Sequence, residues 1–430
     1  MKKWPLLLVL PLCAGLYASS QSHAQAEPSA PEPQIETQAE LDAYALGHRD
    51  ANLDRLGHAF ANSEARLFWN TDLEAAKKQA ARENKPILAL RLLGNLSDEY
   101  SCANSRFFRV LFYPQSQINE RLRHDFVLFW SSERPVPIIT IDMGDGRILK
   151  RTITGNSAHY LLDASGRPLD VFPGLTTPAT FDAWLASSQK LAQEFKAQPQ
   201  PERAAWLAKW HTDRLRDALT LATPPNPQAP NLPALDAQLQ GAINSNPLES
   251  SVTVRPVSAS VAAPIASGKR LAESPLLNAI GLKSVVPADA PVYLSAQPLL
   301  DAATLARIRA MNPLMAQPKT QLPSVQSVAL AQTPQKSSED ARFDALMRTF
   351  ESALRADTRQ NQKFSLSLHA LFARGHEGNF DSLNRRVYDR LFLTPRSDQW
   401  LGLTTDTAFS ALQNDGVVLP TEVKTLQSSN

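Results

Sequence analysis

The amino-acid sequence predicts an α/β domain and a small all-α C-terminal domain, joined by a Pro/Ala-rich, largely disordered middle. Three observations lead to this prediction. Branched apolar and aromatic residues are densest over 64–197, proline clusters over 198–337, and apolar residues recur at helical spacing over 338–416. The chain has 430 residues, which is enough for two or three domains.

The first 26 residues have the pattern of a bacterial export signal. Lys2 and Lys3 precede the apolar run WPLLLVLPLCAGLY, and Ala24-Gln25-Ala26 offers a small-x-small cleavage site. The run is too short to span a bilayer. We therefore expect a cleaved signal and a periplasmic or secreted protein. A lipoprotein anchored through Cys13 is the minor alternative, because Leu12 occupies the position where lipoprotein signals require a small residue.

Composition excludes several classes of protein. The formal charge of +2 gives no electrostatic footprint for nucleic acid, and two cysteines exclude a four-cysteine zinc or iron–sulfur site. After the signal no run of about 20 apolar residues occurs, so no transmembrane segment is expected. Cleavage leaves Cys102 as the only thiol. It is either a reactive or intermolecularly bonded thiol, or a buried small hydrophobe.

The elements of the N-terminal half follow in order from local signals. Residues 27–63 form a helical extension after a frayed Pro/Glu/Ala-rich start. Asp72 caps a helix that ends at Lys85-Pro86, where the apolar strand Ile87–Leu90 begins. A helical stretch is then expected to begin at Cys102. The remaining expected elements are the helix through Ile118 and Leu122, the buried strand Phe126–Trp130, the hairpins Ile138–Ile141 with Ile148–Ile153 and His159–Leu162 with Leu169–Phe172, and the helix Phe181–Phe195.

The middle and the C-terminal segment differ in composition. Eighteen of the 32 prolines fall in the middle segment, 198–337, so we expect a linker with short helices such as Leu300–Met311. Burial of some of its segments against the folded domains is the alternative. Ser337–Asp340 matches a capping box, Asp398–Leu403 forms a turn anchored by Trp400, and 417–430 is a tail. The helical stripes are Phe343, Leu346, Met347, Phe350 and Leu354, then Phe364, Leu368, Leu371 and Phe372, then Leu383, Val387 and Leu391.

Part of the α/β region resembles a known family. An alanine-rich helix leads through Lys85-Pro86 into an apolar strand, Cys102-Ala103-Asn104-Ser105 opens the next helix, and Leu161–Pro168 contains a late strand with an Asp-x-x-Gly turn. In order and spacing these pieces, over 64–197, resemble exported thioredoxin-like domains. The resemblance implies a thioredoxin fold with the redox position at Cys102. The C-terminal helical domain resembles no family that we recognise.

The sequence departs from that family in two places. The second redox cysteine is replaced by Ser105, which gives a monothiol Cys-x-x-Ser variant, and no proline lies near Ser157, where the family has a cis-proline facing the thiol. Without a resolving thiol the chain cannot release its own mixed disulfide.

These residues define the predicted site. Cys102 is the candidate nucleophile at a helix start, and Ser105 occupies the resolving position without resolving. The candidate neighbours are His159, placed on a loop facing that helix, together with Ser157 and Arg106.

Three functions are consistent with this site. The first is monothiol thiol–disulfide exchange or client binding in the cell envelope, through mixed disulfides of Cys102. The second is a non-catalytic scaffold built on a degenerate thioredoxin fold. The third is a periplasmic metallochaperone that uses Cys102 with His159. Protein clients are the expected partners, and no cofactor or resident metal is predicted. The sequence identifies neither client nor pathway nor oligomeric state.

Overall fold

The computed structural model describes residues 33–48, 52–222, 232–249, 298–312 and 336–403, and the single residues 262, 265, 411, 412 and 417. The predicted export signal with Cys13 lies outside the described residues, as do much of the predicted linker and nearly all of the predicted tail. The chain divides into two units, and every element below belongs to the second, Glu36–Asn430.

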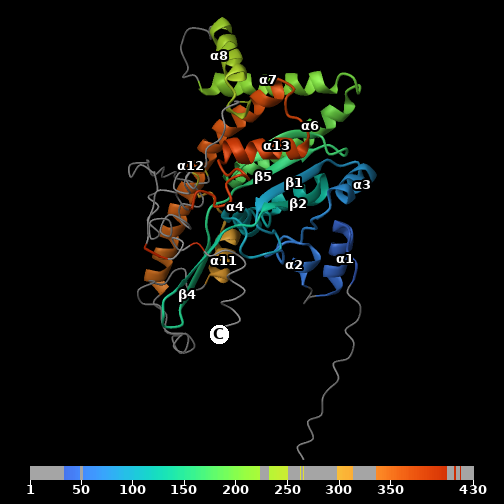
Figure 1. Ribbon diagram of the computed structural model, residues 1–430. Coiled ribbons are helices and arrows are strands. Elements are labelled where there is room, and N and C mark those ends of the chain that lie inside the picture. The colour runs from blue at the N-terminus through green and yellow to red at the C-terminus, as the bar shows by residue number, and fades with distance from the viewer. Residues whose placement is uncertain are drawn as a thin grey trace, which may run out of the picture. The chain divides into compact units, whose positions relative to one another are not determined.

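The α/β region is built on a four-stranded mixed sheet with the strand order β2-β1-β5-β6 (Figure 1). The second strand in that order, β1, pairs in parallel with β2 and antiparallel with β5, and β5 pairs antiparallel with β6. A separate antiparallel hairpin, β3 with β4, follows β2. The predicted strands are confirmed. Their bounds are β1 Ile87–Leu93, β2 Val127–Arg134, β3 Ile138–Asp142, β4 Ile148–Thr152, β5 Ser157–Leu162 and β6 Pro168–Pro173.

Polar caps and a proline set the ends of the helices in this region. Asp72 Oδ1 accepts a hydrogen bond from the Ala75 N–H at 2.7 Å, so Asp72 is the N-cap as predicted, and Asn84 ends the helix in the left-handed conformation. Thr177 caps the last helix, which begins at Pro178. The bounds are α1 Gln38–Gly47, α2 Leu53–Leu56, α3 Leu73–Glu83, α4 Ala103–Phe107, the π-helix η1 Phe108–Phe112, α5 Ser116–Asp125 and α6 Pro178–Ala197.

Helices from two parts of the chain cover the two faces of the sheet. Because side chains alternate along a strand, His159 and Tyr160 of β5 point to opposite faces. The Tyr160 ring lies 5.1 Å from Phe380 of α13 (Phe380–Arg386), whereas the His159 ring lies 4.9 Å from Phe181 of α6. The connection between β2 and β5 contains the β3–β4 hairpin and no helix. The C-terminal helix α13 therefore covers sheet surface that this connection leaves open.

Helices of the predicted linker and of the C-terminal segment pack together. α7 is 20 residues long and packs against α12, whereas the sequence analysis expects short helices in this part of the chain. Leu207, His211 and Leu215 are buried at i, i+4 and i+8, which explains why α7 is stable despite the nearby prolines. α12 also contacts β6. The bounds are α7 Arg203–Ala222, α8 Leu232–Asn244, the 3-10 helix η2 Pro247–Glu249, α11 Ala302–Met311, α12 Lys336–Ala373 and the π-helix η5 Val387–Leu391.

One local prediction for the C-terminal segment is wrong and one stays a prediction. α12 begins at Lys336, and the side chain of Ser337 lies outside the described part of the structure, so the capping box stays a prediction. Trp400 is 47% exposed, and the neighbouring Leu401 is the buried residue of the predicted turn. The first two apolar stripes lie on the single helix α12, because no glycine or proline interrupts it.

One hydrophobic cluster joins segments that the sequence analysis assigns to separate domains. It contains Leu88 and Leu161 of the sheet together with Leu371 of α12 and Leu383 of α13. Within the described residues there is therefore no break in packing between the α/β region and the C-terminal helices.

Candidate functional site

Cys102 lies directly after the loop that follows β1, where it is the N-cap residue of α4. Its N–H donates to the carbonyl of Leu93, the last residue of β1, at 3.0 Å. The side chain is fully buried, with 0% exposure, and belongs to the hydrophobic core. The predicted position at the start of a helix is thus correct, and the thiol does not reach the surface.

The thiol and the Ser105 hydroxyl share one hydrogen-bond network. Cys102 Sγ donates to Ser105 Oγ at 3.4 Å. Ser105 Oγ in turn lies 2.8 Å from both the Cys102 carbonyl oxygen and Ser101 Oγ, and it donates its single proton to one of these acceptors. A hydroxyl has one proton, so bonding to either acceptor leaves none for donation to the sulfur. Ser105 therefore accepts a hydrogen bond from the thiol.

A buried arginine completes this network. Arg109 is 2% exposed and donates to Ser101 Oγ and to the Leu96 carbonyl, and also to the carbonyls of Ser105 at 3.3 Å and Asp98 at 3.1 Å. Burial lowers the pKa of Arg109 to about 10, so the side chain is still charged at neutral pH. The guanidinium holds the loop before α4 against the helix.

Two further segments cover Cys102. A Cβ atom placed on Gly155 would lie 3.3 Å from the Cys102 Cβ, so the loop before β5 packs directly against Cys102, and the φ of 98° at Gly155 suits glycine. Asn156 in that loop accepts from Asn104 Nδ2 at 2.9 Å. The carbonyl of Asn156 accepts a hydrogen bond from Tyr388 of η5, also at 2.9 Å. The C-terminal segment thus holds down the loop that encloses Cys102.

The predicted neighbours of Cys102 lie in different surroundings. His159 is inside β5 and not on a loop, which corrects the sequence prediction. Its Nε2 is 2.7 Å from the Tyr113 hydroxyl, and burial lowers its pKa to about 3, so the ring is neutral. Ser157 is buried at the start of β5. Arg106 donates to the Ser101 carbonyl and to Thr152 Oγ1 of the hairpin.

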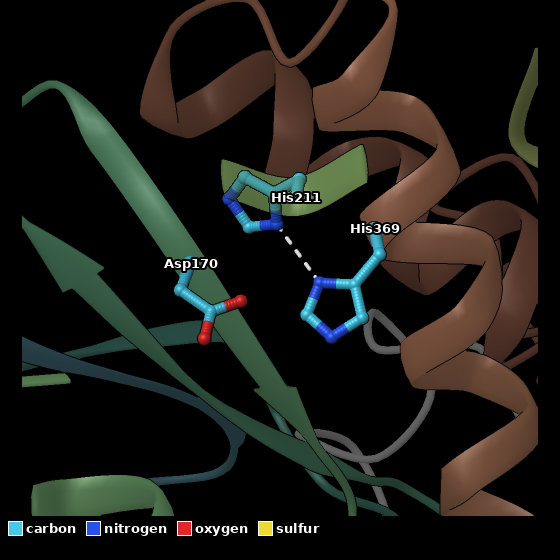
Figure 2. A group of neighbouring side chains, drawn as sticks. All are labelled: Asp170, His211 and His369. Carbon is cyan, nitrogen blue, oxygen red and sulfur yellow. Dashed lines mark hydrogen bonds between the residues drawn. The ribbon is translucent and has the colours of Figure 1, made fainter. Parts of the chain in front are cut away.

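A second polar cluster, which the sequence analysis does not predict, joins β6, α7 and α12. Figure 2 shows Asp170 of β6, His211 of α7 and His369 of α12 facing one another. One ligand atom from each residue lies within 4.8 Å of the others. The two Nδ1 atoms are 2.8 Å apart, and His211 Nε2 lies 2.8 Å from the Leu169 carbonyl.

Burial dominates the electrostatics of this cluster. It raises the pKa of Asp170 and lowers that of His211 and His369, because each charged form loses hydration. The two histidines are 158 residues apart in the chain. No local motif could reveal such a cluster. Only the packing of α7 against α12 brings the histidines together, which agrees with the alternative that parts of the middle segment are buried against the folded domains.

Comparisons with known protein families, with curated proteins and with solved structures find no match to this chain. The class of protein is therefore assigned from the fold and the site alone. The chain is an α/β protein with a mixed sheet, and the core of this sheet is shared with the C-terminal helices. No helix among the residues that the structure describes combines the length and apolar character needed to cross a membrane.

Proposed function

We propose that the chain is an exported thioredoxin-like protein of the bacterial cell envelope that binds other proteins non-covalently and uses Cys102 for packing. The burial of the thiol carries this proposal. The sulfur lies in the core and is hydrogen-bonded to Ser105. The loop that contains Gly155 packs against Cys102, and Tyr388 holds this loop in place through a hydrogen bond. A disulfide partner needs access to a thiolate, and a buried structural cysteine is inert.

The thioredoxin-like assignment is supported by topology. In the family that the sequence resembles, a central strand leads to the helix that starts at the redox position. Here β1 has a parallel neighbour on one side and an antiparallel neighbour on the other, and Cys102 caps the helix that follows it. The late hairpin of β5 and β6 turns at Asp163, whose carboxylate accepts from the Ser165 N–H at 2.8 Å. The export signal predicted in residues 1–26 supports the location.

The β3–β4 hairpin is the surface that we propose for protein binding. Ile138, Met143 and Ile148 are 46%, 54% and 63% exposed, and they are three of the few large apolar side chains exposed in the described structure. The hairpin is a two-stranded sheet, so each strand has one edge without a partner strand among the described residues. Exposed apolar side chains beside free strand edges favour binding to an extended segment of another protein.

Site-specific photo-crosslinking tests the proposal. A photoreactive residue is placed at Ile148 on the hairpin, or at Lys78 on the exposed face of α3 as a matched control. We expect protein adducts from position 148 in intact cells, absent from position 78, and retained when Cys102→Ala is added. Equal adducts at both positions, or loss of the adducts with Cys102→Ala, would contradict it.

Monothiol exchange remains the second candidate, favoured by one observation. Cys102 is the N-cap residue of the helix that follows the central strand, the position of the redox cysteine in the family that the sequence resembles. This activity requires the Gly155 loop to open. Accumulation of Cys102-dependent mixed disulfides with client proteins in cells would establish it, and their absence would leave the binding function.

A further inference from the structure

The Asp170, His211 and His369 cluster has ligand types that suit a metal ion. Two imidazoles and one carboxylate are a common ligand set for divalent transition metals, with the remaining coordination position open to water. Each residue comes from a different element, β6, α7 and α12, so the atoms converge only in the folded chain. Figure 2 shows the carboxylate and both rings turned toward the same space.

The hydrogen bonds around the cluster leave ligand atoms available. A carbonyl oxygen only accepts, so His211 Nε2 carries the proton in its 2.8 Å contact with Leu169, and the lone pair is on Nδ1. Nδ1 faces the cluster. A histidine that gives its other N–H to a backbone carbonyl is the usual arrangement of a metal-bound imidazole.

The carboxylate is also held in place. Asp170 Oδ2 accepts from Trp184 Nε1, and Oδ1 accepts from the Val171 N–H, both at 2.8 Å. Asp170 is 4% exposed and forms no salt bridge within the described residues, and burial raises its pKa although His369 and Arg214 act against the rise. An isolated buried carboxylate is unfavourable, whereas a bound divalent cation would supply the missing positive charge.

We propose that Asp170, His211 and His369 bind one divalent transition-metal ion and thereby fasten α7 and α12 to the sheet edge at β6. The ion takes the place of the hydrogen bond between the two imidazoles. His211 and His369 both coordinate through Nδ1, and the proton that His369 Nδ1 gives to the hydrogen bond moves to its Nε2. This site is independent of Cys102 and of the proposed binding hairpin.

Metal binding is measured on the full chain with Zn²⁺ as the probe. The protein is stripped with a chelator, dialysed, and titrated with Zn²⁺ while bound metal and thermal unfolding are recorded. We expect one Zn²⁺ per chain and a higher unfolding temperature. Asp170→Asn and His369→Gln should each lower the affinity about tenfold or more. His48→Gln, at an exposed histidine of the N-terminal segment, should leave it unchanged, and so should Cys102→Ala.

A second measurement does not depend on whether the variants fold. Co²⁺ added to the stripped wild-type chain should give the visible absorption of a nitrogen- and oxygen-ligated ion at one equivalent, and Zn²⁺ should remove it. Binding below one equivalent in the wild type would overturn the proposal. Equal affinity in the correctly folded Asp170→Asn chain, or loss of the site in Cys102→Ala, would overturn it as well.

Discussion

The surroundings of Cys102 and the Asp170 cluster are both buried polar regions, and they differ in the chemistry of their side chains. Around Cys102 the thiol, Ser105 and Arg109 all bond to one another or to nearby backbone. In the cluster, two imidazoles bond to each other and a carboxylate lies beside them without an ion pair in the described structure. Asn104 Oδ1, Asn156 Nδ2 and Ser157 Oγ near Cys102 are buried without a hydrogen-bond partner, so satisfaction of polar groups does not separate the two regions. Only the cluster combines two imidazoles with a carboxylate, the ligand types that bind transition metals.

Both regions depend on the C-terminal helices. Tyr388 of η5 holds the loop over Cys102, and His369 of α12 belongs to the cluster. Cys102, which lies in a recognisable sequence motif, is therefore shielded from solvent. The cluster of Asp170, His211 and His369 has no sequence motif, and its side chains are arranged like metal ligands. A motif gives the position of a residue along an element, but accessibility depends on segments far away in the chain.

The largest expected effect is the loss of Arg109 from the Cys102 network. Arg109→Ala removes the buried hydrogen bonds to Ser101 Oγ and to the carbonyls of Leu96, Asp98 and Ser105, and we expect it to lower the free energy of unfolding by about 3 kcal/mol or more. Chemical denaturation measures the change. Arg147→Ala, at an exposed arginine paired with Asp145, should change it by less than about 0.5 kcal/mol. Similar losses in the two variants would show that the network is not structural.

The second largest effect is the loss of folding stability in acid that is caused by the buried His159. Its pKa is about 3 in the folded protein and about 6.5 when unfolded, so only the unfolded chain takes up a proton as the pH falls from 7 to 5. Stability attributable to His159 is complete above pH 6.5, and about 2 kcal/mol of it is lost by pH 5. The His159→Gln chain should lose about that much less than the wild type over this range. Equal losses in the two chains would mean that the ring is not buried and neutral.

The smallest effect is expected from loosening the loop that packs against Cys102. Tyr388→Phe removes the hydrogen bond to the Asn156 carbonyl, which contributes about 1 kcal/mol. Thiol labelling of Cys102 in the native chain should therefore speed up about fivefold. Tyr44→Phe on α1 is the control and should leave the rate unchanged. A rate unaffected by Tyr388→Phe would exclude this residue from the cover.

Most elements of the α/β region could be predicted because their signals are local. Asp72 caps its helix through a side chain three residues from its partner, and Pro86 precedes the apolar run of β1. The length of α12 follows equally from the absence of helix breakers. The exposure of Trp400 could not be predicted, because burial of the neighbouring Leu401 depends on tertiary packing.

The candidate sites could be predicted only in part. The position of Cys102 at a helix start follows from the order of strand, loop and helix, whereas its burial depends on Gly155 and Tyr388, far along the chain. The resemblance to thioredoxin-like domains implies a loop position for His159, whereas its pairing with Leu90 places it inside β5. The cluster of Asp170, His211 and His369 forms only when α7 and α12 pack beside β6, and no local sequence pattern specifies this packing.

Thiol labelling of the native protein tests the central claim, that Cys102 is a packing residue, most directly. In a Cys13→Ser chain only Cys102 can react, and its labelling by a soluble maleimide is timed in native buffer and in denaturant. An opening free energy of about 4 kcal/mol corresponds to native labelling about a thousandfold slower than in the unfolded chain. We expect native labelling of Cys102 to be slowed by about this factor. Native labelling as fast as in the unfolded chain would contradict it.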